Sequence, residues 1–262
     1  MTNLGALGAA LNTTGPEAVA AAAELEELGY GTVWLPGGQA SNLPLIADVI
    51  HGTAKIPVAS GILPVDRVPS ADVARAYADL PAGRFVVGLG GAHGPRPFAT
   101  LNDYLDELDD TVPASARILS ALGPKMLELS RDRASGAYPF LVTTDYVASA
   151  REILGAGKQL VVLLSVVAET DPAAGRERAR NGSLRFLAGM PGYANNFRRM
   201  GFTDADITDL SDRLVDGLTV RGDLDTVVAR LREYRAAGAD QVVVPAGDLP
   251  REWWPALAEA LR

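Results

Sequence analysis

Short apolar runs alternate with longer amphipathic segments along the whole chain, and this alternation constrains the fold more than any other feature. Eight of the runs have the length and aliphatic content of buried strands, and segments with helical periodicity follow them. The expected strands are residues 4–11, 32–36, 57–63, 84–90, 114–122, 136–142, 159–169 and 240–247. The expected helices are residues 15–31, 43–53, 70–80, 98–110, 125–134, 145–154 and 252–262, with several more within 171–238.

Strands separated by helices are expected to run parallel, because a parallel connection needs a crossover segment. Eight such units in 262 residues predict an α/β fold, a (β/α)₈ or TIM barrel with a helical excursion between strands seven and eight. An open doubly wound sheet is the alternative, but it would carry a glycine fingerprint early in the chain, and none occurs there. The length and the absence of linkers predict a single domain over residues 1–262.

Charge and residue content exclude several classes of function. The net charge is −8 and no Lys/Arg-rich run occurs, so no nucleic-acid partner is expected. The chain has no cysteine, which fits a reducing compartment, and its two histidines form no H-E-x-x-H motif, so no metal is expected. No apolar run reaches the roughly 18 residues of a membrane span, and the N-terminus lacks a signal-peptide pattern. These features predict a cytoplasmic protein without a membrane partner.

The stretch RFVVGLGGAHGPRP, residues 84–97, raises the question of a phosphate-binding turn. A G-x-G-x-x-G pattern counted from Gly88 would need glycine where His93 stands, and Pro95 and Pro97 prevent a helix directly after the glycines. The stretch is better interpreted as a strand that opens into a loop carrying His93. That side chain is either a loop histidine bonded to backbone or an acid/base group facing a ligand, since histidine titrates near neutral pH.

A second junction, LGPKM, has the form of an anion-binding turn. Gly123 permits close approach of another group, and Pro124 suits the first turn of a helix, where its missing N–H is no loss. The N–H groups of Lys125 and Met126 would then face an anion at the positive end of the helix. The alternative is an ordinary strand–helix turn with a solvated lysine.

Polar residues in the excursion form a further candidate. The segment MPGYANNFRRMGF contains Tyr193, Asn195, Asn196, Arg198 and Arg199. Two interpretations stay open at this point: an ordinary polar helix surface, or a segment that contacts an anion or closes as a lid.

Five segments, in order along nearly the whole chain, carry a family resemblance. They are AAELEELGYGTVWLP, VASGILPVDRVPSADVARAYADLPAGRFVVGLGGAH, ALGPKMLELSRDRASGAYPFLVTTDYVASAREILG, NNFRRMGF and DRLVDGLTVRGDLDTVVARLREYRAAGADQVVV. Together they resemble the bacterial luciferase-like superfamily of flavin and deazaflavin oxidoreductases, and most closely an actinobacterial group dependent on coenzyme F420. The resemblance implies a luciferase-like barrel, hydride transfer between deazaflavin and a small organic substrate, and a homodimer.

The resemblance also implies a cofactor site at the C-terminal ends of the strands. The cofactor ring would lie over a bulge in strand three, often with a non-prolyl cis peptide, which maps to Gly61 and Ile62. The loop after strand four would approach the ring with Gly90 and Gly91, and His93, which stands where related deazaflavin dehydrogenases have an acid, would be the catalytic proton donor. The phosphate would be held after strand five, which maps to Leu122, Gly123, Pro124, Lys125 and Met126.

One departure from the family keeps other functions open. Many relatives place an acidic residue or a histidine at the end of strand two, where this chain reads Pro36-Gly37-Gly38. The alternatives are an FMN-dependent luciferase-like monooxygenase and a degenerate barrel that binds no cofactor and serves as a binding or assembly protein.

Overall fold

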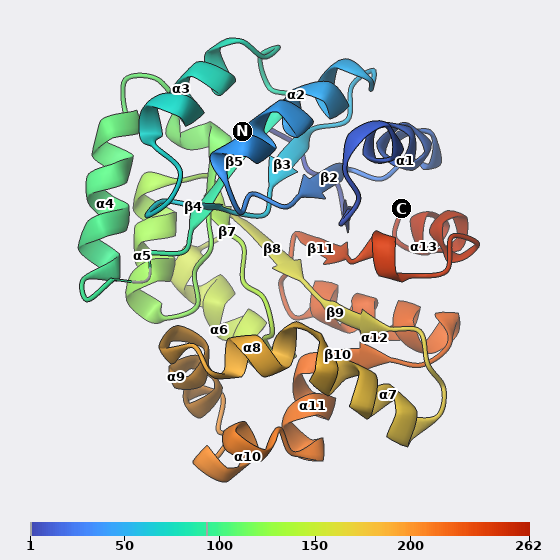
Figure 1. Cartoon of the computed structure of the whole chain (residues 1–262). Coiled ribbons are helices and arrows are strands. Elements are labelled where there is room, and N and C mark those ends of the chain that lie inside the picture. The colour runs from blue at the N-terminus through green and yellow to red at the C-terminus, as the bar shows by residue number, and fades with distance from the viewer. Residues whose placement is uncertain (1, 93) are drawn as a thin grey trace.

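A closed ring of parallel strands forms the centre of the molecule (Figure 1). The computed structural model describes residues 2–92 and 94–262. Within them, the ring contains eight strands, and it closes because β1 pairs with β11 and β3 pairs with β5. The strands of the ring are β1 (Leu7–Ala10), β2 (Thr32–Leu35), β3 (Val58–Ser60), β5 (Phe85–Gly90), β6 (Arg117–Leu119), β7 (Gly136–Ala137), β8 (Gln159–Leu163) and β11 (Gln241–Val244). The predicted (β/α)₈ barrel is therefore confirmed.

Helices cover the outside of the ring, as expected for a barrel whose strands are joined by crossovers. They are α1 (Gly15–Leu28), α2 (Leu43–His51), α3 (Ser70–Ala78), α4 (Pro97–Leu108), α5 (Pro124–Arg133), α6 (Thr144–Leu154), α12 (Leu224–Ala236) and α13 (Trp253–Ala260). Short 3₁₀ turns occur at Ala40–Asn42, Ala114–Ala116 and Ala246–Asp248. Several helices begin with proline in their first turn, where the missing N–H costs no hydrogen bond.

The inside of the ring is filled by side chains and is not a pore. Trp34 and Tyr138 stack there with ring centroids 4.0 Å apart and planes 8° from parallel. The indole N–H of Trp34 donates to the side-chain oxygen of Gln241 at 3.1 Å, so the buried indole is satisfied. The remaining members of this inner cluster are Leu4, Ala59, Val86, Ile118, Val161 and Val243. Any ligand site must therefore lie at a mouth of the barrel.

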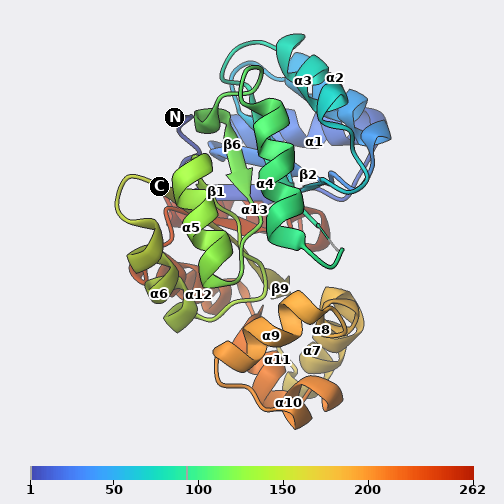
Figure 2. The same ribbon diagram turned by 90° about the vertical axis from the view of Figure 1, so that its left-hand side faces the viewer.

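The excursion forms a separate lobe beside the barrel (Figure 2). Its elements are α7 (Pro172–Ala179), a π-helical turn (Arg180–Leu184), α8 (Arg185–Ala188), α9 (Pro191–Arg199), α10 (Asp204–Asp209) and α11 (Asp212–Leu218). These helices pack around a small apolar core that includes Phe197, Phe202, Leu214 and Leu218, and Leu141, which follows β7 of the barrel, is also part of it.

The strand predicted over residues 159–169 is wrong in one respect, because it divides at Leu164. Its first part, β8, stays in the ring beside β11, and its second part, β9 (Ser165–Val167), leaves it. There β9 pairs with β10 (Thr219–Arg221), a strand that the sequence analysis missed. A continuous apolar run does not reveal where a strand changes partner, because both halves are equally apolar.

Candidate functional site

The bulge predicted in strand three lies at the C-terminal mouth of the barrel. The peptide bond between Gly61 and Ile62 is cis, which matches the expectation for this position. After it, β4 (Leu63–Pro64) continues beside β5. Gly61 is exposed and Ile62 is half-buried, so this backbone faces the open mouth. A Cβ atom built on Gly61 would lie 3.4 Å from the Tyr138 hydroxyl oxygen, which places that phenol beneath the bulge.

Close packing of β5 against β3 accounts for glycine in this strand. A Cβ atom on Gly88 would lie 1.9 Å from the carbonyl oxygen of Ser60, so no other residue fits between β3 and β5 at this point. The Ser60 hydroxyl donates to the Gly88 carbonyl at 3.0 Å and accepts from the Gly88 N–H at 2.8 Å. The glycine-rich stretch is thus a close strand contact and not a dinucleotide fingerprint.

A cavity of about 440 Å³ lies between the ends of β5 and β6 and the excursion. Its barrel wall contains five residues predicted to bind the cofactor, which are Gly90, Gly91, Leu122, Gly123 and Met126. Its opposite wall comes from α8 and α9 and includes Phe186, Leu187, Met190 and Tyr193. The volume lies in the range of small-molecule sites, about 300–1,000 Å³. We call this space the mouth cavity.

Other predicted residues lie outside the mouth cavity. Gly61 and Ile62 are not among its lining residues, although Ile62 packs close to Gly88 and Gly90. Lys125 is exposed and its side chain lines no cavity described here, whereas Pro124 lines a neighbouring pocket.

The turn between β6 and α5 carries fewer free donors than predicted. Gly123 is the N-cap of α5, and its carbonyl accepts from the N–H of Met126 at 3.0 Å and from that of Leu127 at 3.0 Å. The expectation that Met126 N–H is free is therefore wrong, because the first turn of the helix tightens and uses it. The N–H of Lys125 stays at the positive end of the helix, where an anion is favoured.

The excursion supplies a cation at this same turn. A Cβ atom on Gly123 would lie 3.3 Å from Nη2 of Arg199 and 3.6 Å from its Cζ, so the guanidinium covers the N-terminal end of α5. Arg199 Nη2 donates to the side-chain oxygen of Asn196 at 3.1 Å. Among residues 2–92 and 94–262, Arg199 has no carboxylate partner. An unneutralised guanidinium over a helix N-terminus is a favourable environment for a phosphate.

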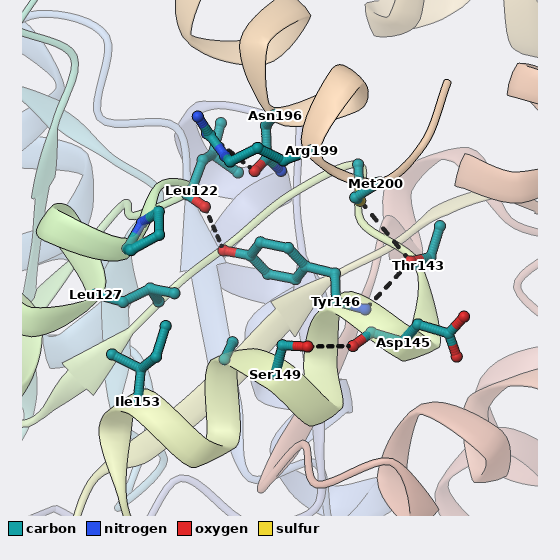
Figure 3. A pocket seen from close by; sticks show the side chains of 12 residues that line it. Leu122, Leu127, Thr143, Asp145, Tyr146, Ser149, Ile153, Asn196, Arg199 and Met200 are labelled. Carbon is teal, nitrogen blue, oxygen red and sulfur yellow. Dashed lines mark hydrogen bonds between the residues drawn. The ribbon is translucent and has the colours of Figure 1, made fainter. Parts of the chain in front are cut away.

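A second pocket, of about 310 Å³, lies behind the turn between α5, α6 and α9 (Figure 3). The Tyr146 hydroxyl donates to the Leu122 carbonyl at 2.9 Å and approaches the Ala121 carbonyl at 3.2 Å. The hydroxyl of Thr143 accepts from the Tyr146 N–H at 3.2 Å and caps α6. Tyr146 therefore ties α6 to the strand end that precedes Gly123. We call this space the helix pocket.

Three phenols lie in or near the barrel mouth, and burial raises the pKa of each hydroxyl. They are Tyr138 beneath the bulge, Tyr193 in the wall of the mouth cavity and Tyr146 in the helix pocket. Each phenol stays protonated at neutral pH and can donate a hydrogen bond, because loss of its proton would place a charge in a poorly solvated position.

The predicted catalytic residue, His93, lies outside the described residues, so its role stays a prediction. Within the part of the chain that the structure describes, no cluster of three or more His, Cys, Asp or Glu side chains could hold a metal. No described helix combines the length and apolar character needed to cross a membrane.

Comparison with solved structures shows that the fold is a known one. The coenzyme F420-dependent tetrahydromethanopterin reductase from Methanopyrus kandleri matches with a TM-score of 0.74 at 16% identity, over 98% of each chain. An F420-dependent secondary alcohol dehydrogenase, in complex with an F420–acetone adduct, matches with a TM-score of 0.74 at 12% identity over 100% of both chains. The chain has the luciferase-like barrel fold.

A flavin enzyme shares this luciferase-like fold. It is the oxygenating constituent of 3,6-diketocamphane monooxygenase, a type II Baeyer–Villiger monooxygenase from the CAM plasmid of Pseudomonas putida, in complex with FMN. Its TM-score is 0.68 at 11% identity, over 100% of this chain and 97% of that one. No protein-family profile and no curated protein sequence matches the chain.

The sequence analysis did not identify which polar side chains of the excursion face the turn between β6 and α5. It named Arg198 and Arg199 together, but only Arg199 faces the turn, whereas Arg198 pairs with Asp204 at 2.6 Å. Helical spacing of about 100° per residue separates two consecutive side chains, yet it does not say which one faces the barrel. Nothing in the sequence distinguished Tyr146 from the other residues of its amphipathic helix.

Proposed function

We propose that the chain is a coenzyme F420-dependent oxidoreductase that transfers a hydride between the deazaflavin and a small organic substrate. The observation that carries the proposal is the guanidinium of Arg199 over the N-cap of α5, at the edge of the mouth cavity. The proposal also draws on the two F420-dependent proteins that share the fold over nearly their whole length.

The residues present fit such a cofactor. Gly123 leaves room for the guanidinium of Arg199 above the turn, and a phosphate there would meet one formal positive charge and the positive end of α5. The wall formed by Gly90 and Gly91 lacks side chains, so a planar ring could approach the backbone closely. The opposite wall offers Leu187 and Met190 to the apolar part of the ligand.

The roles of the chain's own residues follow from this arrangement. When bound, the deazaflavin supplies the two-electron redox chemistry, and the protein supplies position and protons. Arg199 and the start of α5 would hold the phosphate, while α8 and α9 would exclude water from the mouth cavity. Tyr193 would donate a hydrogen bond into the cavity, since burial raises its pKa. His93 stays the predicted proton donor. A single domain and a cytoplasmic location, expected from the sequence, and a homodimer, implied by the resemblance, also stay predictions.

Titration of the purified protein with F420 and, separately, with FMN tests the proposal, with quenching of cofactor fluorescence as the readout. We expect F420 to bind about tenfold or more tightly than FMN, a difference of about 1.4 kcal/mol. Tighter binding of FMN would overturn the proposal in favour of a flavin-dependent monooxygenase. Binding of neither would support the degenerate barrel instead.

A further inference from the structure

The helix pocket contains a buried donor that the fold leaves unused. Asn196 on α9 is completely buried and lines this pocket. Its side-chain oxygen accepts from Arg199, but within the described residues its Nδ2 group has no hydrogen-bond partner. Buried donors in native proteins are nearly always paired with protein, water or ligand, so this amide calls for an acceptor that enters the pocket.

The helix pocket and the mouth cavity are immediate neighbours. Leu122 and Arg199 line both spaces, and Figure 3 shows Arg199 and Asn196 reaching from α9 toward the Leu122 turn. A group held by Arg199 therefore lies at the border between the two. A ligand whose phosphate sits at this border can place its ring in one space and a further substituent in the other.

The lining of the helix pocket limits the chemistry of that substituent. Leu127, Ala150 and Ile153 form an apolar side, and the Tyr146 and Ser149 hydroxyls are already bonded to backbone carbonyls. Asp145 is exposed at the pocket and disfavours a second carboxylate beside it. The unused donor of Asn196 therefore suits a neutral carbonyl oxygen better than an anion.

We infer that the helix pocket binds the acyl extension of the deazaflavin cofactor beyond its phosphate, with Asn196 Nδ2 donating to the first acyl carbonyl. This inference rests on the proposed function. F420 carries a lactyl group amide-linked to glutamate on its phosphate, whereas FMN ends at the phosphate. Only the neutral lactyl amide enters the pocket, and the glutamate carboxylates extend past Asp145 into solvent. The pocket thus gives the chain a way to distinguish the two cofactors independently of their rings.

Two deazaflavins that share ring and phosphate isolate this effect. One is F420 with a single glutamate, and the other is the deazaflavin riboside 5′-phosphate, which lacks the acyl extension. We expect the wild-type chain to bind F420 at least about fivefold more tightly, as one additional hydrogen bond to a buried donor would give. In Asn196→Leu and Asn196→Asp this ratio falls to about one, because both remove the donor.

Asn195→Leu is the matched control. Asn195 pairs with Arg198 at 2.9 Å as Asn196 pairs with Arg199, but it is exposed and lines the mouth cavity, not the helix pocket. Any change that Asn195→Leu causes at the ring affects both deazaflavins alike, so the ratio is retained. Circular dichroism checks that each variant is folded, and Asn196→Asp keeps the amide's shape if Asn196→Leu does not fold.

Equal wild-type affinity for both deazaflavins, or a ratio of affinities that persists in the Asn196 variants, overturns the inference alone. Binding of neither deazaflavin removes the proposed function and the inference with it.

Discussion

The barrel and the excursion differ most in the size of their apolar cores. In the barrel, apolar side chains fill both the interior and the layer between strands and helices. The excursion has a much smaller core, and ion pairs lie on the surfaces of both regions. The ion pairs of the excursion and its flanking strands are Arg176 with Asp212 and Asp216, Arg178 with Glu169, Arg180 with Asp212, Arg198 with Asp204, Arg213 with Asp206, and Arg221 with Asp216.

The difference indicates which side chains are available for function. Most arginines of the excursion are neutralised by carboxylates of the same lobe, but Arg199 is not neutralised by any described residue and faces the barrel. Asn196, beside it, is buried with an unused donor. The excursion therefore presents an unneutralised guanidinium and an unused amide donor to the barrel mouth, which is the arrangement expected of a lobe that helps to bind a ligand.

The largest effect is expected from emptying the small core of the excursion. Phe197 is fully buried there, so Phe197→Ala should lower the free energy of unfolding by about 3–5 kcal/mol. Because this core consists mostly of excursion residues and is much smaller than that of the barrel, we expect the excursion to unfold first, with two transitions in urea followed by circular dichroism. A single transition with a loss below about 1 kcal/mol would contradict the separation of the two cores.

Separate replacement of Arg198 and Arg199 tests whether an arginine paired within the excursion differs in function from one that faces the barrel. Arg199→Gln should weaken F420 binding about tenfold or more, because charge-assisted hydrogen bonds contribute about 1.5–3 kcal/mol. Arg198→Gln should change it less than about twofold, since exposed ion pairs such as that with Asp204 contribute little. Calorimetric titration measures both. Equal losses of F420 affinity in the two variants would show that the overall positive charge of α9, and not the position of Arg199, determines the affinity.

A smaller effect is expected where the barrel supports the turn. Tyr146→Phe removes the donor to the Leu122 carbonyl and should lower the free energy of unfolding by about 1 kcal/mol. Guanidinium denaturation measures this loss, and F420 affinity should fall in parallel because the turn before Gly123 is less well held. Unchanged stability would mean that the hydroxyl is replaceable by water.

The smallest effect concerns acid sensitivity of the excursion. Hydrogen bonds from Ser211, from the N–H and hydroxyl of Thr203 and from Arg213 hold the pKa of Asp206 well below its usual range. The stabilisation is therefore present above the unfolded-state pKa of about 3.9 and is lost as the pH falls through the lower folded-state pKa. The carboxyl ¹³C shift of Asp206 should titrate well below pH 3.9, and Ser211→Ala should raise its midpoint. A midpoint near 3.9 would contradict this network.

Much of the fold could be predicted from the sequence, because strand and helix periods repeat without interruption around the ring. Positions fixed by backbone geometry were also predictable, as Gly61, Gly90 and Gly123 show. The side-chain partners were not. Lys125 adjoins the turn but lines neither cavity, whereas the guanidinium of Arg199, distant in sequence, lies over Gly123. Such contacts depend on how the excursion docks, which no local pattern encodes.

A crystal structure of the chain with F420 tests the central claim most directly. The account predicts phosphate oxygens within hydrogen-bond distance, about 2.7–3.2 Å, of the Arg199 guanidinium and the first turn of α5, with the ring in the mouth cavity. A phosphate bound elsewhere, with Arg199 making no contact to it, would contradict the account.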